Sequence, residues 1–152
     1  KTKFIKYIKS LQDFANLYFN ARNAMMYSVT RDDKTKENNS SEFVVIEIEI
    51  NIRKSHCDAP VIITDINAAK NASIFYDAQW LSLKTFKKIK ENALQDYFEG
   101  NKAETQAECL IENKVSPSYF KRIHVCCYET RDKVNLIQKR LPININRTMF
   151  FM

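Results

Sequence analysis

The chain has 152 residues, of which 45% are hydrophobic, and this is enough for one compact domain over residues 1–152. It contains a single glycine and three prolines, which excludes the glycine-rich loops of Walker or dinucleotide-binding type, because those loops need glycines where the backbone approaches phosphate. The 24 lysines and arginines outnumber the 18 acidic residues, and the net charge of +6 favours a polyanionic partner without requiring one.

The sequence lacks the signals for membrane insertion and for metal binding. No apolar run approaches the ~18 residues of a membrane span, and no signal segment opens the chain, so we expect a cytoplasmic protein with no membrane partner. The two histidines, His56 and His124, have no partner at ligand or nucleophile spacing. Without C-x-x-C spacing, the cysteines are read as reduced packing residues, the adjacent pair on opposite faces of a strand. They are Cys57, Cys109, Cys126 and Cys127.

The first half of the sequence predicts a helix or loop, a polar connection and two strands. Apolar residues at mostly helical spacing over 4–18 predict a short amphipathic helix or an ordered loop. Residues 30–42 are polar throughout and predict a solvated connection. From 44 to 52, apolar and polar residues alternate, which predicts a strand with one buried face. The apolar run 59–65, with a proline near its entry, predicts a second, more buried strand followed by a loop.

The second half predicts one long helix and then several short elements. Between Leu81 and Gly100 the apolar residues keep a helical period, Ser82 can cap the start, and Gly100 suits the position after the last turn. The short elements are a strand at 107–111, a helical turn opening at Ser116 and Pro117, a strand at 123–128, a helix at 130–139 and a strand at 142–151. Their mixed order predicts an α+β domain.

A side-chain amide and a carboxylate stand two residues apart at the start of the strand predicted at 107–111. In a strand, residues i and i+2 point to the same face, so Gln106 and Glu108 can contact one ligand. Cleavage of the nicotinamide glycosidic bond of NAD passes through a ribose cation, which needs a nearby carboxylate, and Glu108 is the right residue type. A second reading remains open, in which Glu108 is an edge-strand carboxylate that faces water.

One arginine, Arg22, lies within a run of aromatic and thioether side chains. A guanidinium fork suits a diphosphate, and aromatic rings suit stacking on nicotinamide or adenine. The alternative is that the apolar neighbours form core and that Arg22 makes an ordinary surface ion pair. The neighbours are Tyr18, Phe19, Met25, Met26 and Tyr27.

Three segments together resemble the DarT family of DNA ADP-ribosyltransferase toxins, in order and approximate spacing, from about residue 13 to the end. The segments are Tyr18-Phe19-x-x-Arg22-x-x-Met25-x-Tyr27, Ile62-Ile63-Thr64-Asp65-x-x-Ala68, and Gln106-Ala107-Glu108-x-Leu110 followed by Ile123-x-Val125. The first is fairly specific as a whole, and the second is weak by itself.

The resemblance implies an ADP-ribosyltransferase-like mixed sheet with flanking helices that transfers ADP-ribose from NAD to thymidine in single-stranded DNA. It implies a macrodomain antitoxin of the DarG type, which removes the modification, as partner. Glu108 matches the catalytic glutamate of the family, and Arg22 matches its arginine at the NAD and thymine site. The implied NAD contacts are Arg22, Tyr18, Phe19, Met25, Tyr27 and Gln106.

The chain departs from the family pattern in two places. Family members begin with a His-x-Thr-His-like segment that contacts NAD, and nothing in residues 1–30 matches it, so we expect an N-terminally truncated domain. Alanine stands at Ala21 and Ala24, where proline is usual. Two rival functions follow: a nucleic-acid-binding module of the same fold without a competent NAD site, or a transferase that modifies protein.

Overall fold

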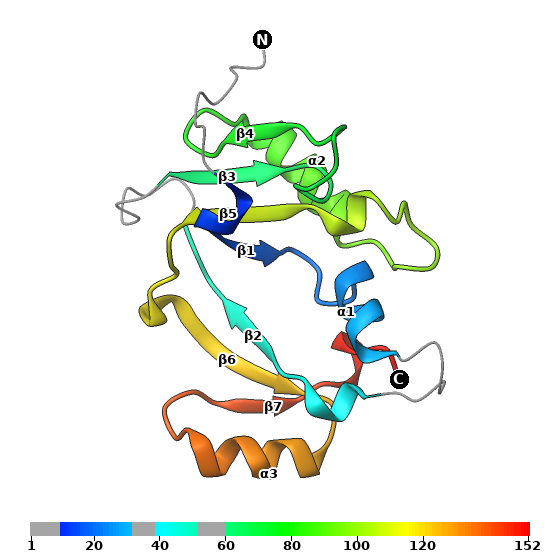
Figure 1. The fold of residues 1–152 in the computed structure, drawn as a ribbon, viewed down its shortest axis with the longest axis vertical. Helices are drawn as coiled ribbons and strands as arrows, with labels where there is room; N and C mark the ends of the chain where they lie inside the picture. Colours follow the sequence, from blue (N-terminus) through cyan, green and yellow to red (C-terminus); the bar gives the residue numbers. More distant parts are fainter. Residues whose placement is uncertain (1–9, 32–38, 52–59) are drawn as a thin grey trace. The chain divides into compact units, whose positions relative to one another are not determined.

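The computed structural model describes residues 10–31, 39–51 and 60–152, so predictions that fall on 4–9, 32–38 and 52–59 lie outside the described residues. The chain divides into two compact units (Figure 1). The first unit is Lys1–Asn23 with Asn51–Val115, and the second is Ala24–Ile50 with Ser116–Met152. Each unit therefore combines two stretches of sequence that are far apart in the chain.

The first unit contains a four-stranded antiparallel sheet. In spatial order its strands are β1 (Phe14–Tyr18), β5 (Glu108–Glu112), β3 (Val61–Thr64) and β4 (Phe75–Asp77). All four residues of β3 are buried, as the apolar run predicts, because β5 and β4 pair with its two edges. The core around Ile62, Ala68 and Leu110 lies on one face of this sheet. A loop was expected after β3, and the three-residue strand β4 was not predicted.

The expected helix or loop over 4–18 is wrong in its described part. Ser10 caps a short 3-10 helix, η1 (Leu11–Asp13), and β1 follows directly. Residues 14–18, Phe-Ala-Asn-Leu-Tyr, do not alternate between apolar and polar, and all five pair with β5. The local spacing of so short a segment does not distinguish a helix from a strand, so the tertiary pairing with β5 decides the outcome.

Helix α2 (Leu83–Ala93) begins as predicted, with the Ser82 hydroxyl accepting the N–H of Thr85, but it ends well before Gly100. The Asp96 carboxylate accepts the N–H of Phe98, and the carbonyl of Asp96 accepts the N–H of Gly100, so the chain turns here. A Cβ at Gly100 would lie 2.7 Å from the Cβ of Gln95, and this close approach explains the glycine better than a helix end does.

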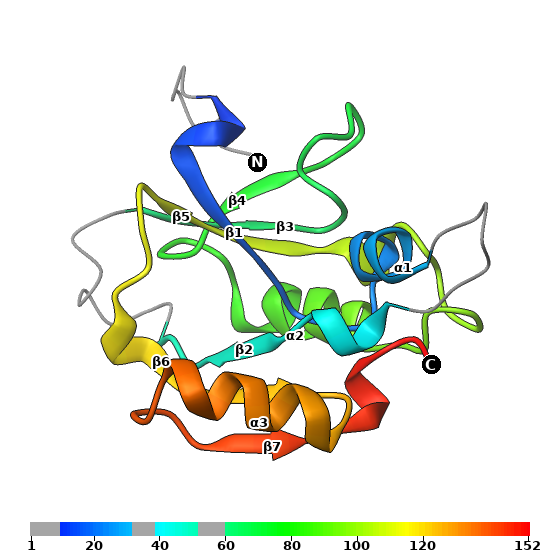
Figure 2. The same ribbon diagram turned by 60° about the horizontal axis from the view of Figure 1, so that its bottom comes forward.

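The second unit contains a three-stranded sheet in the order β2 (Val45–Ile48), β6 (Phe120–Val125) and β7 (Ile143–Ile145). Strand β2 is antiparallel to β6, whereas β6 and β7 are parallel and are joined by α3 (Tyr128–Ile137). Both views show α3 lying alongside β7, so β6, α3 and β7 form a βαβ unit (Figures 1 and 2). Helix α1 (Ala24–Thr30) and the short 3-10 helices η2 (Ser40–Glu42), η4 (Pro117–Tyr119) and η5 (Arg147–Met149) complete this unit.

Several boundaries predicted for the second unit are wrong. The strand expected to reach 128 ends at Val125, opposite Ile145, where its parallel partner ends, so Cys126 and Cys127 follow the strand and Tyr128 begins α3. The strand expected over 142–151 covers only Ile143–Ile145, because the side chain of Asn146 caps η5 immediately afterwards.

The alternation over 44–52 correctly predicts β2 but not a buried face. Val44 and Ile46 keep exposed fractions of 40% and 42%. Alternation shows which residues share a face, and it does not show whether another element covers that face. The overall α+β class is confirmed.

The described residues contain neither a candidate membrane-spanning helix nor a candidate metal site. None of the helices there is long and apolar enough to cross a bilayer. The same part of the chain holds no cluster of three or more side chains able to ligate a metal ion. Three of the four cysteines fall in it as free thiols: Cys109 and Cys126 are buried, and Cys127 is partly exposed.

Candidate active site

Glu108 is the first residue of β5, a central strand of the first sheet, and its exposed fraction is 1%. Its Oε2 accepts a hydrogen bond of 2.8 Å from the side-chain amide of Asn16, and its Oε1 accepts one of 3.1 Å from the backbone N–H of Ala68. Its own N–H donates to the hydroxyl of Thr64 at 3.1 Å. Glu108 is therefore not an edge-strand carboxylate facing water, because three neighbouring segments fix its position.

Burial raises the pKa of Glu108 above the ordinary glutamate value, while the donors at Ala68 and Asn16 act in the opposite direction. The charged form has lost its water, and two hydrogen bonds replace that water only in part. A carboxylate in this state gains strongly from a positive charge or a hydroxyl donor brought close to it. Such a group suits the stabilisation of a developing cation.

Tyr18 stands directly opposite Glu108 in the antiparallel pairing of β1 and β5. Opposed residues in such a pair place their side chains on the same face, so the predicted NAD contact Tyr18 lies beside Glu108. Burial raises the pKa of the Tyr18 hydroxyl, and the nearby charge of Glu108 raises it further. Asn16 is two residues earlier on the same strand face, which brings its amide to Glu108.

Asn16, Thr64 and Ala68 are contacts of Glu108 that reasoning from sequence did not single out. Thr64 and Ala68 belong to the segment of the DarT resemblance that is weak by itself, and both of them bond to Glu108. Asn16 is a polar residue within the short strand Phe14–Tyr18. It would have been noticeable had that segment been predicted as a strand.

Gln106 does not share the strand with Glu108. It ends a 3-10 helix, η3 (Glu104–Gln106), and its side-chain amide donates to the carbonyl of Lys102 at 2.7 Å. The expectation that both side chains follow strand alternation is therefore wrong, because the extended backbone begins only after η3. An i, i+2 argument holds only where both residues are in the strand.

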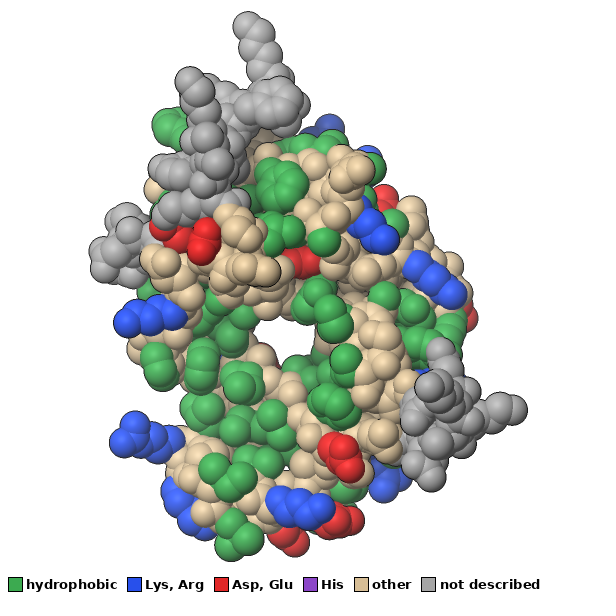
Figure 3. All heavy atoms as spheres, viewed as in Figure 1, with side chains coloured by type: hydrophobic (Ala, Val, Ile, Leu, Met, Phe, Trp, Pro, Cys, Tyr) green, Lys and Arg blue, Asp and Glu red, His purple; other side chains and the backbone are tan. Residues whose placement is uncertain are grey.

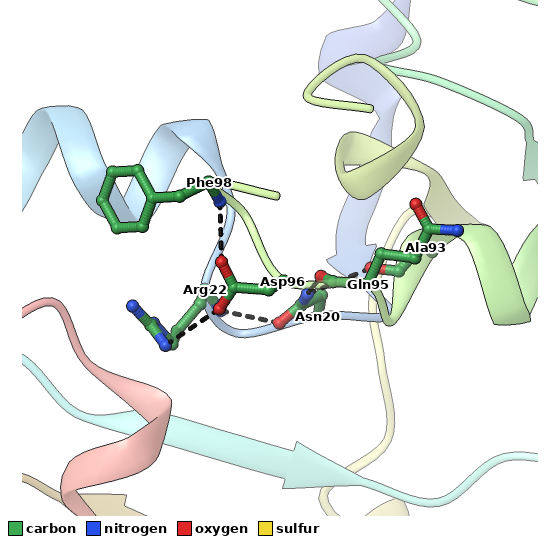
Figure 4. Close-up of polar contacts among 6 residues, drawn as sticks. All are labelled: Asn20, Arg22, Ala93, Gln95, Asp96 and Phe98. Atoms are coloured by element: carbon green, nitrogen blue, oxygen red, sulfur yellow. Dashed lines mark hydrogen bonds and ion pairs between the residues drawn. The ribbon is translucent and has the colours of Figure 1, made fainter. Parts of the chain in front are cut away.

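Arg22 lies in the turn after β1, and its Nη1 lies 3.4 Å from Oδ2 of Asp96 (Figure 4). The turn is fixed by Asn20, whose Oδ1 accepts the N–H of Arg22 at 2.9 Å. The Nδ2 of Asn20 donates to the carbonyls of Ala93 and Gln95 at the end of α2. The exposed fractions of the Arg22 and Asp96 side chains are 30% and 40%, so this ion pair is only partly buried.

The other predicted NAD contacts have packing contacts of their own. Phe19 packs edge-on against Phe86 of α2, with 5.9 Å between ring centroids. Met25 and Tyr27 are in α1, in the second unit, where Met25 is 51% exposed and Tyr27 packs against Phe151 at 5.2 Å. Thus Tyr18 is the one aromatic residue of this set for which the sheet register shows a place beside Glu108.

His124 has a structural pairing in the second sheet. Its Nε2 lies 2.7 Å from Oε2 of Glu47 on the neighbouring strand, and the same oxygen lies 3.2 Å from Nε of Arg122. His56 lies outside the described residues.

The fold is that of a DarT-type ADP-ribosyltransferase. Thermus sp. 2.9 DarT, solved in complex with NAD+, is 16% identical with a TM-score of 0.74, and the match covers 93% of this chain and 74% of that one. The same protein in complex with ADP-ribosylated ssDNA gives 17% identity and a TM-score of 0.75, covering 94% of this chain and 71% of that one. These likenesses confirm the predicted fold.

The chain belongs to the DarT family, described as ssDNA thymidine ADP-ribosyltransferase, which matches residues 2–151. A DNA ADP-ribosyl transferase–DNA ADP-ribosyl glycohydrolase fusion protein of Thermosipho africanus (strain H17ap60334) is 27% identical over 156 residues. That alignment takes in 100% of this chain and 38% of the relative, so the chain spans less than two fifths of the relative's length. The resemblance seen in the sequence is confirmed.

Proposed function

We propose that this protein transfers ADP-ribose from NAD to a thymidine base of single-stranded DNA. Family membership over residues 2–151 supports this reaction, as does a fold shared with a Thermus DarT solved with NAD+ and with ADP-ribosylated ssDNA. The observation that carries the proposal is the state of Glu108. The residue that matches the family's catalytic glutamate is buried and held through both carboxylate oxygens.

NAD supplies an ADP-ribose whose C1′ carbon becomes cationic as the bond to nicotinamide breaks. The Glu108 carboxylate accepts a ribose hydroxyl and stabilises that cation, and its burial strengthens the attraction because little water screens it. Asn16 and Ala68 keep the two carboxylate oxygens in place, so little reorganisation is needed during the reaction. The new bond joins C1′ to the thymine base, whose proton leaves to water.

The remaining site residues are proposed as binding groups. Arg22 orients the diphosphate and the base, and it exchanges its partly exposed contact with Asp96 for these ligand groups. Tyr18 offers a ring beside Glu108 for the nicotinamide ribose end of NAD. The other proposed contacts of NAD are Phe19, Met25, Tyr27 and Gln106.

A macrodomain antitoxin of the DarG type is the proposed partner. The Thermosipho relative is named as a fusion of a DNA ADP-ribosyl transferase with a DNA ADP-ribosyl glycohydrolase, so in that protein the two activities share one chain. We propose that the present protein acts in the cytoplasm, where NAD and single-stranded DNA are both present.

The test is incubation with NAD and a single-stranded oligonucleotide that contains one thymidine, followed by intact mass measurement of the DNA. The expected product is one ADP-ribose on that oligonucleotide and none on a sequence in which cytidine replaces the thymidine. Glu108→Gln should lose the product, whereas Glu91→Gln, which changes an exposed carboxylate on α2, should not.

Two other outcomes would support the rival functions. An oligonucleotide that binds but gains no mass points to a nucleic-acid-binding module. Label from radioactive NAD that appears on added protein and not on DNA points to a protein-directed transferase. Either result would contradict the proposed DNA reaction.

A further inference from the structure

The last part of the chain, which forms β6, α3 and β7, is basic. Residues 116–152 contain seven lysines and arginines and two acidic residues, an excess of five out of a net charge of +6 for the whole chain. Lys, Arg, Asp and Glu side chains are all visible at the surface of this part of the chain (Figure 3). This basic part of the chain therefore attracts a polyanion.

A shallow hollow of about 450 Å³ lies between α3 and β7. One side is formed by Tyr128 and Arg131 from the first turns of α3, and the other by residues 143–146. The hollow lies where the parallel strand β7 ends and the helix begins, and in open sheets with parallel strands ligands bind at the carboxyl ends of the strands. Its volume is within the range of sites for small ligands, and a nucleotide is of that size.

Tyr128 is the main feature of this hollow. Its exposed fraction is 65%, which is high for a tyrosine and leaves ring surface open to water. The Arg131 guanidinium lies 4.8 Å from the centroid of the ring, within the range of a cation–π contact. An aromatic ring that a cation covers on one side and that is open on the other suits stacking with a nucleic-acid base.

Polar and cationic groups suited to a nucleotide surround the ring. Asn144 is exposed, and Asn146 uses its Oδ1 to cap η5, which leaves its amide N–H groups as donors. Arg131 and Lys133 pair with neighbouring carboxylates on α3. Among the described residues, the three cations without a carboxylate partner in this βαβ unit are Lys139, Arg140 and Arg147, and Arg147 directly follows Asn146.

We propose that the hollow between α3 and β7 binds a nucleotide of the single-stranded DNA that flanks the thymidine to be modified. The base stacks on Tyr128, the asparagine side chains contact its edge, and Arg131 and Arg147 attract the adjacent phosphates. A paired duplex does not fit this role, because its bases are stacked on one another. The inference rests on the proposed function, since it specifies how that substrate is held.

The test compares a long oligonucleotide of about 16 nucleotides with a minimal one of about four, each with one central thymidine, lengths within the range of single-strand binding sites. Tyr128→Ala should raise KM for the long substrate roughly tenfold, since one base loses its stacking partner, and leave kcat unchanged. The effect on the minimal substrate should be much smaller. Tyr128→Phe keeps the ring and should behave as the unchanged protein does.

Two further variants sharpen the comparison. Leu136→Ala removes an exposed apolar side chain from the same helix and should have no effect on either substrate. Asp132→Asn removes the carboxylate that pairs with Arg131, and it should tighten binding of the long oligonucleotide more than Glu91→Gln does. Circular dichroism melting should show that each variant is folded.

The inference is overturned if Tyr128→Ala leaves KM for the long oligonucleotide unchanged, or raises KM equally for both lengths. If the unchanged protein modifies neither oligonucleotide, the proposed function has failed. In that case, DNA binding to the hollow is tested separately, by fluorescence anisotropy of the labelled long oligonucleotide in the absence of NAD. Binding weakened by Tyr128→Ala and restored in Tyr128→Phe would support it, and equal binding by all three proteins would overturn it.

Discussion

The carboxylate of Glu108 is almost completely buried, so water is largely excluded from it. The pKa of Glu108 in the folded protein is raised above the ordinary 4.5. Between pH 4.5 and that raised pKa, the folded protein therefore binds the proton more readily than the unfolded chain does. This group's contribution to the free energy of unfolding is therefore fully present below pH 4.5 and is lost as the pH rises through the raised pKa.

The first prediction concerns the acidic side of the pH profile of activity. The rate should rise with pH as Glu108 ionises, and Asn16→Ala should move this rise to higher pH, because a donor that lowers the Glu108 pKa is lost. The measurement is kcat/KM for an oligonucleotide across the acidic range. An acidic limb at the same pH in both proteins would show that Glu108 does not control it.

The second prediction separates a functional Arg22 from a structural one. Its contact with Asp96 is partly exposed, so Arg22→Lys should change the free energy of unfolding by less than about 1 kcal/mol. A lysine cannot reproduce the two-pronged contact with a diphosphate, so activity should fall by about 100-fold. Urea unfolding and ADP-ribose transfer should be measured on the same samples. A loss of stability that accounts for the loss of activity would support the surface ion pair reading.

At the scale of elements, the pairing of β3 with β5 supports the candidate site. The hydroxyl of Thr64 accepts the N–H of Glu108 and donates to the carbonyl of Ile66 at 2.7 Å, and Thr64 is fully buried. One side chain thus joins the end of β3 to the start of β5. The position of the glutamate depends on this junction.

The third prediction tests that junction. Thr64→Val keeps the shape of the side chain but leaves the N–H of Glu108 and the carbonyl of Ile66 without their partner. It should lower the free energy of unfolding by about 2 to 4 kcal/mol in urea denaturation. Thr64→Ser keeps the hydroxyl and should lose clearly less. Equal losses in the two variants would mean that the methyl group, and not the hydrogen bonds, matters at this position.

Elements were predicted well where one local pattern had no competitor. The apolar run of β3 and the Ser82 cap of α2 are of this kind, and both were correct. Strand β1 was not predicted because the spacing of its apolar residues also fits a helix. The predicted helix extended beyond the end of α2 because Tyr97 and Phe98 continue the helical period of apolar residues. The side chain of Asp96 ends that period by bonding to its own local backbone.

For the molecule as a whole, a chain with a net charge of +6 should bind single-stranded DNA in a salt-dependent way. The fourth prediction is a slope of about −3 in a plot of log affinity against log salt, if four phosphates are neutralised. That slope weakens binding about 50-fold between 50 and 200 mM salt. The measurement is anisotropy of a labelled oligonucleotide.

Lys139 and Arg140 have no ion pair with any described residue. Neutralising both, as in Lys139→Gln with Arg140→Gln, should reduce the slope by about 0.7 for each phosphate contact that is lost. Lys84→Gln with Lys88→Gln on α2 in the first unit is the matched control, since it also removes two exposed charges that have no ion pair among the described residues. A binding affinity that does not change with salt would contradict this prediction and would leave stacking as the main source of affinity.

The sequence by itself determined the α+β class, the family, and the two residues on which the chemistry is proposed to depend, Glu108 and Arg22. Local propensity, charge and motif order are properties of the chain, so they can be read without coordinates. Whether the single domain over residues 1–152 works as one body stays a prediction.

Only the tertiary structure decided what surrounds Glu108. Asn16 is 92 residues away in sequence, and Thr64 is 44 residues away. Both reach Glu108 because antiparallel pairing places β1 and β3 on its two sides. Sheet register is set by contacts between distant segments, and a one-residue shift would turn Asn16 to the opposite face. The burial of Glu108 also results from contacts between distant segments, and this burial raises its pKa.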